Sequence, residues 1–280
     1  MVREQGYYSV RTGKHPNGAR LDLASLKKIF LSIDRQLRDR GFFQEAFGYN
    51  CVDAGDVPGT LGEDIEGTIL IALRKNDIWP IWQQIDAYAE DDLFDVIEFL
   101  FDNVSKPVDG HFHNFNNCGM HYSSFNRSEG QQEFRTILNP ILAAYEEGFT
   151  LSENGEMLTM PEAGMSQLLE ATLPKFDPEN IEERVQAATN RFRRYKASLE
   201  DRKHALRDLA DVLEYLRPKI QTALLSKDEA DLFNLANNFG IRHHNEKQKT
   251  GYDPAIWYSW MFYYYLATIH ACVRLIAKKK

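Results

Sequence analysis

The residues best suited to chemistry lie near the C-terminus of the 280-residue chain, in a short polar run. The run is Arg242, His243, His244 and Asn245, and Asn238 stands four residues before Arg242. A guanidinium can hold a phosphate by two parallel hydrogen bonds, and an imidazole can transfer protons near neutral pH. Together these groups could cleave RNA through the ribose 2′-hydroxyl without a metal ion. The competing interpretation is that Arg242 and His243 cap the last carbonyls of a helix.

Two predicted helices position this polar run. Ser226 and Glu229 form a capping-box pattern, and the apolar spacing that follows predicts a helix that ends at about Arg242. Asp253 and Pro254 then supply the N-cap and first residue of a final helix. The polar run is therefore expected to lie between two helices of a bundle.

A basic segment at residues 184–207 is a second candidate for binding anions. It carries eight Lys and Arg residues against Glu200 and Asp201, in a chain whose net charge is −8. The residues that we expect to contact RNA are Arg191, Arg193, Arg194, Lys196, Arg202 and Lys203. The alternative is an ordinary solvated helix face. The acidic remainder of the chain argues against nucleic-acid binding elsewhere, because phosphate binding depends on Lys and Arg.

A third group combines histidine with cysteine and is the candidate for metal binding. His111, His113, Cys118 and His121 are residue types that bind zinc. However, only four residues separate His113 from Cys118, which is shorter than the usual gap between two pairs of zinc ligands. We therefore favour a polar loop held by side-chain-to-backbone hydrogen bonds, and we expect no metal and no other cofactor.

The remaining pattern predicts a mainly α-helical protein. Asp22 and Gly41 bound a first amphipathic helix, and Thr60 with Glu63 forms a capping box before a second. Residues 108–130 have no helical period and are expected to form a long ordered loop. One small β-hairpin is expected at 149–159, because Asn-Gly at 154–155 can supply two residues with positive φ.

Prolines divide the chain into two expected domains. Pro161, Pro174 and Pro178 resist one long helix, so we place a boundary near residue 170, between a helical domain at 1–170 and a helical bundle at 171–280. Within the bundle, residues 178–216 are predicted to form a single helix that ends before Pro218.

Several classes of protein are excluded by missing patterns. No stretch approaches the roughly 18 apolar residues of a membrane span, and no phosphate-binding glycine loop occurs. The three cysteines are widely separated, which is typical of a reducing compartment and predicts a cytoplasmic protein that does not bind membranes.

The polar run and its neighbours carry a resemblance to a known family. Residues 202–214, 235–245 and 252–260 resemble the HEPN-like C-terminal modules of bacterial abortive-infection proteins. Residues 7–14 and 43–48 are similar to the N-terminal domain that accompanies them in AbiJ-type proteins. The resemblance implies a four- to five-helix bundle that dimerises, a metal-independent endoribonuclease and a role in phage defence.

The same resemblance assigns roles to the polar run. Arg242 would hold the scissile phosphate, His243 or His244 would act as acid and base, and Asn238 or Asn245 would orient them. The family pattern places a further histidine after four to six intervening residues, whereas this chain has Lys, Gln and Lys at 247–249. The alternative is therefore a non-catalytic HEPN-like sensor that binds RNA or a protein.

Overall fold

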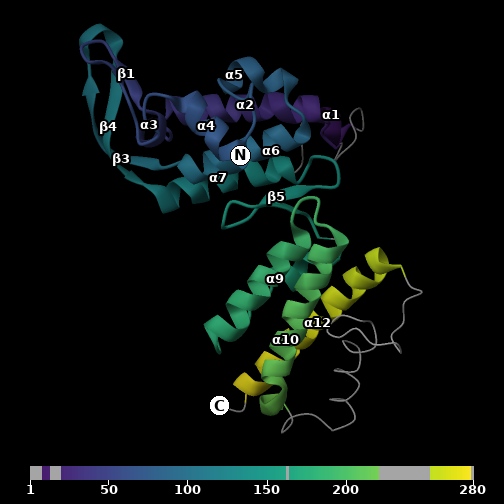
Figure 1. Cartoon of the computed structure of the whole chain (residues 1–280). Helices are drawn as coiled ribbons and strands as arrows, with labels where there is room; N and C mark the ends of the chain where they lie inside the picture. Colours follow the sequence, from purple (N-terminus) through teal and green to yellow (C-terminus); the bar gives the residue numbers. More distant parts are fainter. Residues whose placement is uncertain (1–7, 13–19, 162–163, 221–252, 279–280) are drawn as a thin grey trace. The chain divides into compact units, whose positions relative to one another are not determined.

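The computed structural model describes residues 8–12, 20–161, 164–220 and 253–278, and these are mainly helical with small two-stranded sheets (Figure 1). The chain forms two compact units, Met1–Met157 and Leu158–Lys280, called unit 1 and unit 2 here. The division therefore falls before the boundary that the prolines predict near residue 170. The boundary lies earlier because Leu168, Leu169 and Leu173 pack against the core of unit 2 and so belong to that unit.

Within its described residues, unit 1 is built from short and medium helices with three pairs of strands. Its helices are α1 (Tyr8–Arg11), α2 (Leu23–Asp39), α3 (Gln44–Phe47), α4 (Ile65–Leu73), α5 (Ile81–Gln84), η1 (Ile85–Ala87), α6 (Glu90–Asn103), η2 (Phe115–Asn117) and α7 (Arg127–Leu142). The strands are β1 (Tyr49–Cys51), β2 (Gly55–Val57), β3 (Lys106–His113), β4 (Gly119–Asn126), β5 (Phe149–Leu151) and β6 (Met157–Thr159), and β6 continues into unit 2.

The helical core of unit 1 lies where α7 contacts both α2 and α6. The predicted ends of α2 are confirmed: the Asp22 carboxylate accepts a hydrogen bond from the Ser25 backbone N–H at 2.8 Å, and Gly41 has a φ of +81°. Phe30 of α2 and Leu100 of α6 are almost completely buried. Each such side chain stabilises the fold by roughly 2 to 3 kcal/mol relative to exposure.

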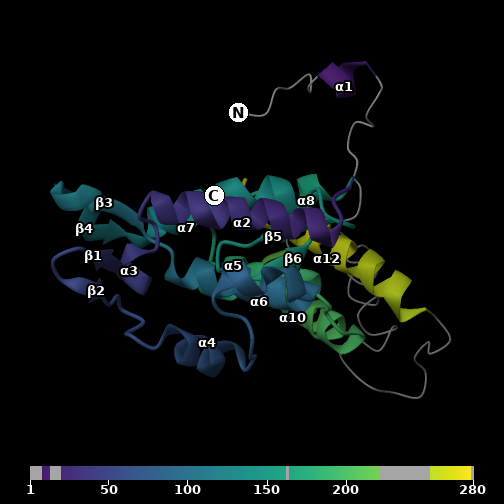
Figure 2. The same ribbon diagram turned by 90° about the horizontal axis from the view of Figure 1, so that it is seen from above.

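At one end of unit 1, the hairpins β1–β2 and β3–β4 project beyond the helices, and we call residues 49–57 and 106–126 the arm (Figures 1 and 2). The expectation of a loop at 108–130 is wrong, because most of this stretch pairs as two antiparallel eight-residue strands and α7 begins at Arg127. The sequence does not reveal these strands, because both of their faces carry polar side chains and the apolar alternation of a half-buried strand is missing.

Helix α3 anchors the arm to the helical core. The Gln44 amide donates a hydrogen bond to the Met120 carbonyl at 2.9 Å and accepts one from the Tyr122 backbone N–H at 3.0 Å. Gly110 lies so close to β4 that an added Cβ would stand 2.5 Å from the His121 carbonyl oxygen. These contacts fix the register in which β4 presents its side chains.

Two further turn predictions need correction. The single expected hairpin exists as β5 and β6, but only Gly155 of the Asn-Gly pair has a positive φ, +82°. Helix α4 is capped by Asp64, which accepts a hydrogen bond from the Gly67 backbone N–H at 2.8 Å, and not by a box of Thr60 and Glu63.

Unit 2 contains α8 (Ser166–Glu170), η3 (Pro178–Glu182), α9 (Glu183–Arg193), α10 (Leu199–Ile220) and α12 (Pro254–Ala277) among its described residues. The single helix predicted at 178–216 is wrong, because the chain breaks after α9, where Lys196 has a φ of +53°. Ser198 then caps α10, accepting a hydrogen bond from the Asp201 backbone N–H at 3.1 Å. Helix α10 also continues through Pro218.

Helix α10 packs against both α9 and α12 and forms the core of unit 2. The rings of Phe192 and Phe262 stack with centroids 4.0 Å apart. The predicted start of α12 is confirmed, since the Asp253 carboxylate accepts a hydrogen bond from the Ala255 backbone N–H at 2.9 Å. Within the described part of the chain, no helix has the length and apolar character needed to cross a membrane.

Candidate metal centre

Four side chains with metal-binding atoms converge in the arm. They are Cys51, His113, Cys118 and His121, and their ligand atoms all lie within 4.8 Å of one another. Cys51 ends β1, His113 ends β3, Cys118 lies between η2 and β4, and His121 belongs to β4. Both hairpins of the arm therefore contribute to one cluster.

The register of β3 and β4 brings His113 and His121 together, and the turn between the two strands adds Cys118. His113 pairs with Gly119 and His111 pairs with His121, so alternation along the strands places the three histidines on one face. Between the strands, Asn116 and Gly119 have positive φ values of 48° and 108°. These residues favour that conformation, and they turn the chain so that Cys118 faces the histidines.

Two of the separations in the cluster are close to those around a tetrahedral zinc ion, and none exceeds 4.8 Å. The Cys51 Sγ lies 3.7 Å from the His113 Nδ1, and the Cys118 Sγ lies 3.2 Å from the His121 Nε2. Zinc–sulfur bonds of about 2.3 Å and zinc–nitrogen bonds of about 2.0 Å imply ligand-to-ligand separations of about 3.3 to 3.8 Å in a tetrahedron. The side chains thus need only small shifts to surround one ion.

Backbone groups prepare Cys51 to act as a thiolate. Hydrogen bonds from the backbone of Ala54 and of Asp53 lower the pKa of the Cys51 thiol, and its contact with Cys118 lowers it further. Metals bind the thiolate form of cysteine. The turn between β1 and β2 therefore favours the protonation state that a zinc site requires.

The two histidines are held in orientations and charge states that suit a ligand. The His113 Nε2 lies 3.2 Å from an Asp53 carboxylate oxygen, so its Nδ1 is left to face Cys51. A carboxylate on the second nitrogen of a histidine is a common support for a metal ligand. Burial lowers the pKa of His121, with smaller contributions from His111 and His113, and this favours the neutral imidazole that binds metals.

The donor set decides what such a site can do. Two cysteines and two histidines are typical of zinc, whereas calcium and magnesium prefer oxygen ligands. Four protein ligands complete a tetrahedron and leave no position for water or substrate. The arrangement is therefore suited to holding structure and not to metal-assisted catalysis.

The structure brings together three of the four metal candidates read from the sequence and replaces the fourth. His111 is exposed and lies outside the group, although its ring is 5.3 Å from that of His121. Cys51 takes its place from a position 62 residues before His113. The short gap between His113 and Cys118 is no obstacle, because one hairpin supplies three ligands and the other supplies the fourth.

Sequence reasoning missed Cys51 because only tertiary structure connects the two hairpins. One local signal was available: Cys51 is followed within four residues by Asp53 and Gly55, which suit a tight turn whose backbone N–H groups face a sulfur.

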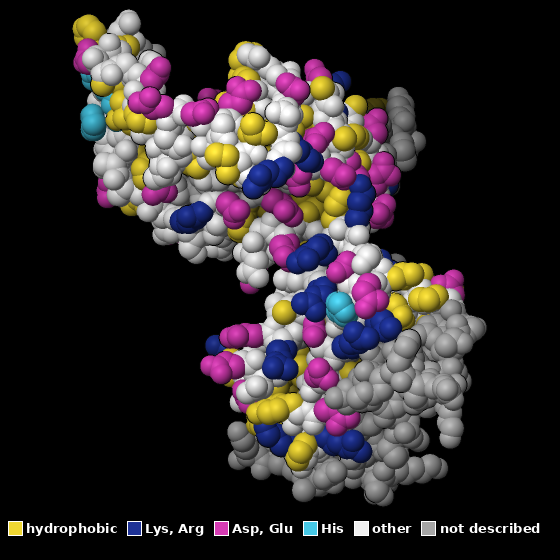
Figure 3. Space-filling model, viewed as in Figure 1, with side chains coloured by type: hydrophobic (Ala, Val, Ile, Leu, Met, Phe, Trp, Pro, Cys, Tyr) yellow, Lys and Arg dark blue, Asp and Glu magenta, His cyan; other side chains and the backbone are white. Residues whose placement is uncertain are grey.

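Figure 3 places histidine side chains at the surface of the arm, next to hydrophobic ones.

The basic residues expected to bind RNA lie at the end of α9, in the following turn and at the start of α10. Several have structural partners: Arg191 pairs with Asp208 at 2.7 Å, and the Arg193 guanidinium donates a hydrogen bond to the Thr159 carbonyl at 3.0 Å. Arg202 lies over the Phe192 ring. Figure 3 shows basic and acidic side chains interspersed on this unit.

Among these six residues, Arg194 and Lys196 are the most exposed, whereas Lys203, like the other three, is only partly accessible. The polar run Arg242, His243, His244 and Asn245, together with Asn238, lies outside the described residues.

Two other histidines, His204 and His270, lie in unit 2. His204 on α10 lies 3.2 Å from the Glu200 carboxylate, one helical turn away. His270 of α12 is buried in unit 2, and burial lowers its pKa.

Comparisons with known proteins found no relative for this chain. No family model, no curated protein and no solved structure matches it.

Proposed function

We propose that the protein binds one zinc ion through Cys51, His113, Cys118 and His121, and that this ion holds the two hairpins of the arm together. The observation that carries the proposal is the convergence of four zinc-type ligand atoms within 4.8 Å from segments far apart in the chain. Asp53 adds support, because its carboxylate and its backbone N–H reach two different ligands.

The arm needs such a link. Strands β1 and β2 have only three residues each, and isolated two-stranded hairpins are marginally stable in water. A zinc ion bonded to both hairpins closes the chain between Cys51 and His113. Its binding free energy therefore becomes folding free energy of the arm.

Metal analysis of protein purified without a histidine tag tests this proposal. We expect about one zinc per chain after purification, or after reconstitution with zinc and removal of the excess. Cys51→Ser and His121→Ala should reduce the zinc content to near zero at equal chelator concentration, because three ligands hold zinc far more weakly than four.

Two matched controls sharpen the result. His111→Ala removes a histidine that neighbours the cluster, and Cys272→Ala removes a cysteine of α12 that lies in unit 2. Both variants should retain about one zinc per chain. A wild-type chain without zinc after reconstitution, or an equal loss in His111→Ala, would contradict the proposed ligand set.

We also propose that unit 2 acts on RNA in phage defence as a HEPN-like bundle that dimerises. The support is the resemblance of its segments to HEPN-like modules and the exposure of Arg194 and Lys196 in the turn between α9 and α10. Within this proposal, Arg242 and His243 would act in metal-independent cleavage, or the bundle would bind RNA or a protein without cleaving.

One set of assays separates these possibilities. Incubation with total cellular RNA in EDTA should yield cleavage that Arg242→Ala and His243→Ala abolish, if the bundle is an endoribonuclease. Salt-dependent binding without cleavage would support the non-catalytic form, and light scattering would measure the dimer. Binding should weaken in Arg194→Gln/Lys196→Gln more than in Arg274→Gln/Lys278→Gln, which removes the same charge from the end of α12. No binding at low salt would contradict an action on RNA.

A further inference from the structure

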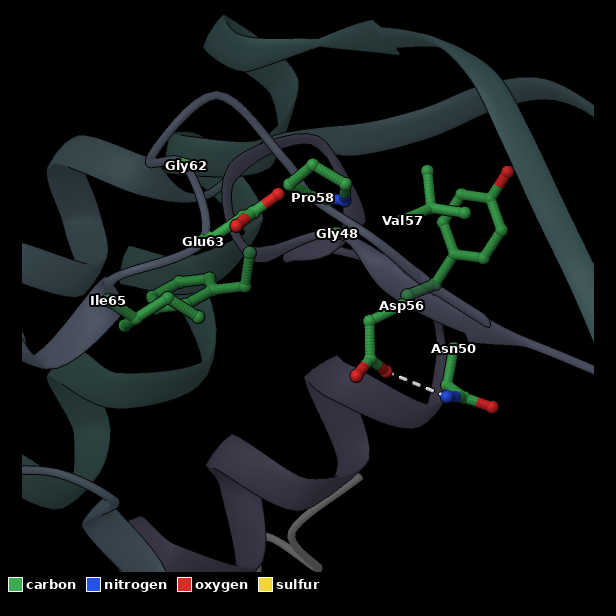
Figure 4. A pocket seen from close by; sticks show the side chains of 10 residues that line it. Gly48, Asn50, Asp56, Val57, Pro58, Gly62, Glu63 and Ile65 are labelled. Carbon is green, nitrogen blue, oxygen red and sulfur yellow. Dashed lines mark hydrogen bonds between the residues drawn. The ribbon is translucent and has the colours of Figure 1, made fainter. Parts of the chain in front are cut away.

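A pocket of about 610 Å³ lies beside the metal cluster, between β1–β2 and the start of α4. Figure 4 shows Asp56 and Asn50 on one side of the pocket, and Glu63, Pro58 and Ile65 on the other. The aromatic side chains of Phe47 and Tyr49 complete its walls. The pocket thus combines two carboxylates with aromatic and aliphatic surface.

The walls of this pocket are fixed by close backbone packing. Gly48 has a φ of +76°, and a Cβ added to it would stand 1.9 Å from the Val57 carbonyl oxygen. The backbone N–H groups of Thr60 and Leu61 donate hydrogen bonds of 2.8 and 3.0 Å to carbonyls of α3. The pocket is therefore formed before a ligand arrives, which lowers the entropy cost of binding.

The charge around the pocket selects a positively charged ligand. Residues 41–73 contain six Asp and Glu residues and no Lys or Arg, and residues 107–126 contain no Lys or Arg either. The guanidinium of Arg38 lies 4.9 Å from the centre of the Phe47 ring, but it is paired with the Asp34 carboxylate at 2.9 Å. A phosphate-bearing ligand would therefore meet mainly carboxylates at this pocket. Among the described residues, Asp56 is engaged only by the Asn50 amide, at 2.7 Å, and Glu63 has no partner.

The chain itself contains an arginine in comparable surroundings. Arg38 lies 2.9 Å from the buried carboxylate of Asp34, and its guanidinium is 4.9 Å from the centre of the Phe47 ring and 5.2 Å from that of Trp79. A planar guanidinium binds carboxylates by its N–H groups and packs its face on aromatic rings. The pocket offers the same two kinds of contact to an arginine from outside.

We propose that this pocket binds an arginine side chain in a basic segment of a partner polypeptide. The arginine's guanidinium bonds to Asp56 and Glu63, and its aliphatic part packs on Tyr49, Pro58 and Ile65. The inference rests in part on the proposed zinc centre, because the Tyr49 ring lies 4.3 Å from that of His121 and Cys51 follows two residues later. Zinc therefore holds one wall of the pocket.

Fluorescence polarisation with three labelled peptides of alternating alanine and a test residue can examine this inference. The test residues are arginine, lysine and citrulline, and citrulline keeps the shape of arginine without its charge. We expect the arginine peptide to bind the zinc-loaded chain most tightly and the citrulline peptide about tenfold or more weakly. Equal binding of the arginine and citrulline peptides, or preference for lysine, would overturn the inference.

A pair of double variants separates the pocket from the general acidity of the chain. Asp56→Asn/Glu63→Gln should weaken binding of the arginine peptide about tenfold. Glu66→Gln/Asp86→Asn makes the same change of charge at exposed positions outside the pocket and should have less than about threefold effect. Equal weakening in both variants would overturn the proposed pocket.

Zinc content measured on the same samples keeps the two proposals apart. Absence of peptide binding in a chain with one zinc overturns the pocket alone. Peptide binding by a chain that never holds zinc overturns the zinc proposal alone. If zinc binding and peptide binding are coupled, removal of zinc weakens peptide binding, and excess peptide slows removal of zinc by a chelator.

Discussion

The helical core of unit 1 and its arm are stabilised by different means. In the core, α2, α6 and α7 bury large apolar side chains such as Phe30, Leu100 and Phe134. In the arm, most of β3 is exposed, and the buried groups near its tip include Cys51 and His121. A segment that buries little apolar surface can therefore still adopt one defined structure, provided that a few polar side chains converge on one point.

The largest effect should come from a cavity in the core. Leu100→Ala removes a completely buried side chain of α6 and should lower the free energy of unfolding of unit 1 by about 3 kcal/mol. Urea denaturation followed by circular dichroism measures this change. Ile71→Ala, at a position 72% exposed, should change it by less than about 0.5 kcal/mol. Equal effects of the two substitutions would mean that the packing of α6 does not stabilise the core of unit 1.

Removal of zinc should act on the arm and leave the helical core intact. Hydrogen exchange before and after treatment with a strong chelator should become faster in residues 49–57 and 106–126, because the two hairpins lose their link. The amides of α2 and α6 should exchange at nearly unchanged rates. If exchange accelerates equally throughout unit 1, then the arm and the core are one cooperative unit.

Thiol reactivity separates the arm cysteines from the one in unit 2. With zinc bound, alkylation at pH 8 should be slow at all three cysteines. After zinc removal, Cys51 should react quickly, because backbone hydrogen bonds lower the pKa of its thiol, and Cys118 should become accessible. Cys272 should stay unreactive, since burial raises the pKa of its thiol to about 11. Mass spectrometry of the digested protein locates the label. If Cys272 reacts before Cys51 and Cys118, the expected order of reactivity is wrong.

The smallest effect concerns a partly buried carboxyl group on α6. Burial raises the pKa of Glu98, although its carboxylate accepts a hydrogen bond from the Met157 backbone N–H at 2.6 Å. A raised pKa in the folded state means that ionised Glu98 destabilises the fold above that pKa, and that this cost disappears as the pH falls towards the unfolded pKa. Glu98→Gln should therefore raise stability modestly at pH 7 and change it less at pH 4.5.

Thermal unfolding of this variant and the wild type at both pH values measures the difference. A loss of stability at pH 7 that exceeds the loss at pH 4.5 would mean that the hydrogen bond to Met157 outweighs the cost of burying the charge.

The parts of the fold that the sequence predicts well are those with strong local signals. Asp22 and Gly41 mark the ends of α2, and Asp253 with Pro254 marks the start of α12, because capping depends on neighbouring residues. The arm was hidden because its strands lack apolar alternation. The break between α9 and α10 was missed because it depends on a positive φ at Lys196 and a capping serine within an otherwise continuous helical pattern.

The candidate site divides in the same way. His113, Cys118 and His121 were readable as potential ligands because they lie within one short segment. Cys51 cannot be read in this way, since its approach depends on the contact of α3 with β4 and on the packing of the Tyr49 ring of β1 against the His121 ring of β4. The sequence alone favours a polar loop over a metal site, whereas the joint geometry of the two hairpins favours the metal site.

The proposed zinc centre can be tested directly by the zinc content of the wild-type chain and of Cys51→Ser, measured side by side after identical reconstitution. We expect about one zinc per chain in the wild type and almost none in Cys51→Ser, while His111→Ala keeps its zinc. A wild-type chain that holds no zinc, or a Cys51→Ser chain that holds as much as the wild type, would contradict the proposed centre.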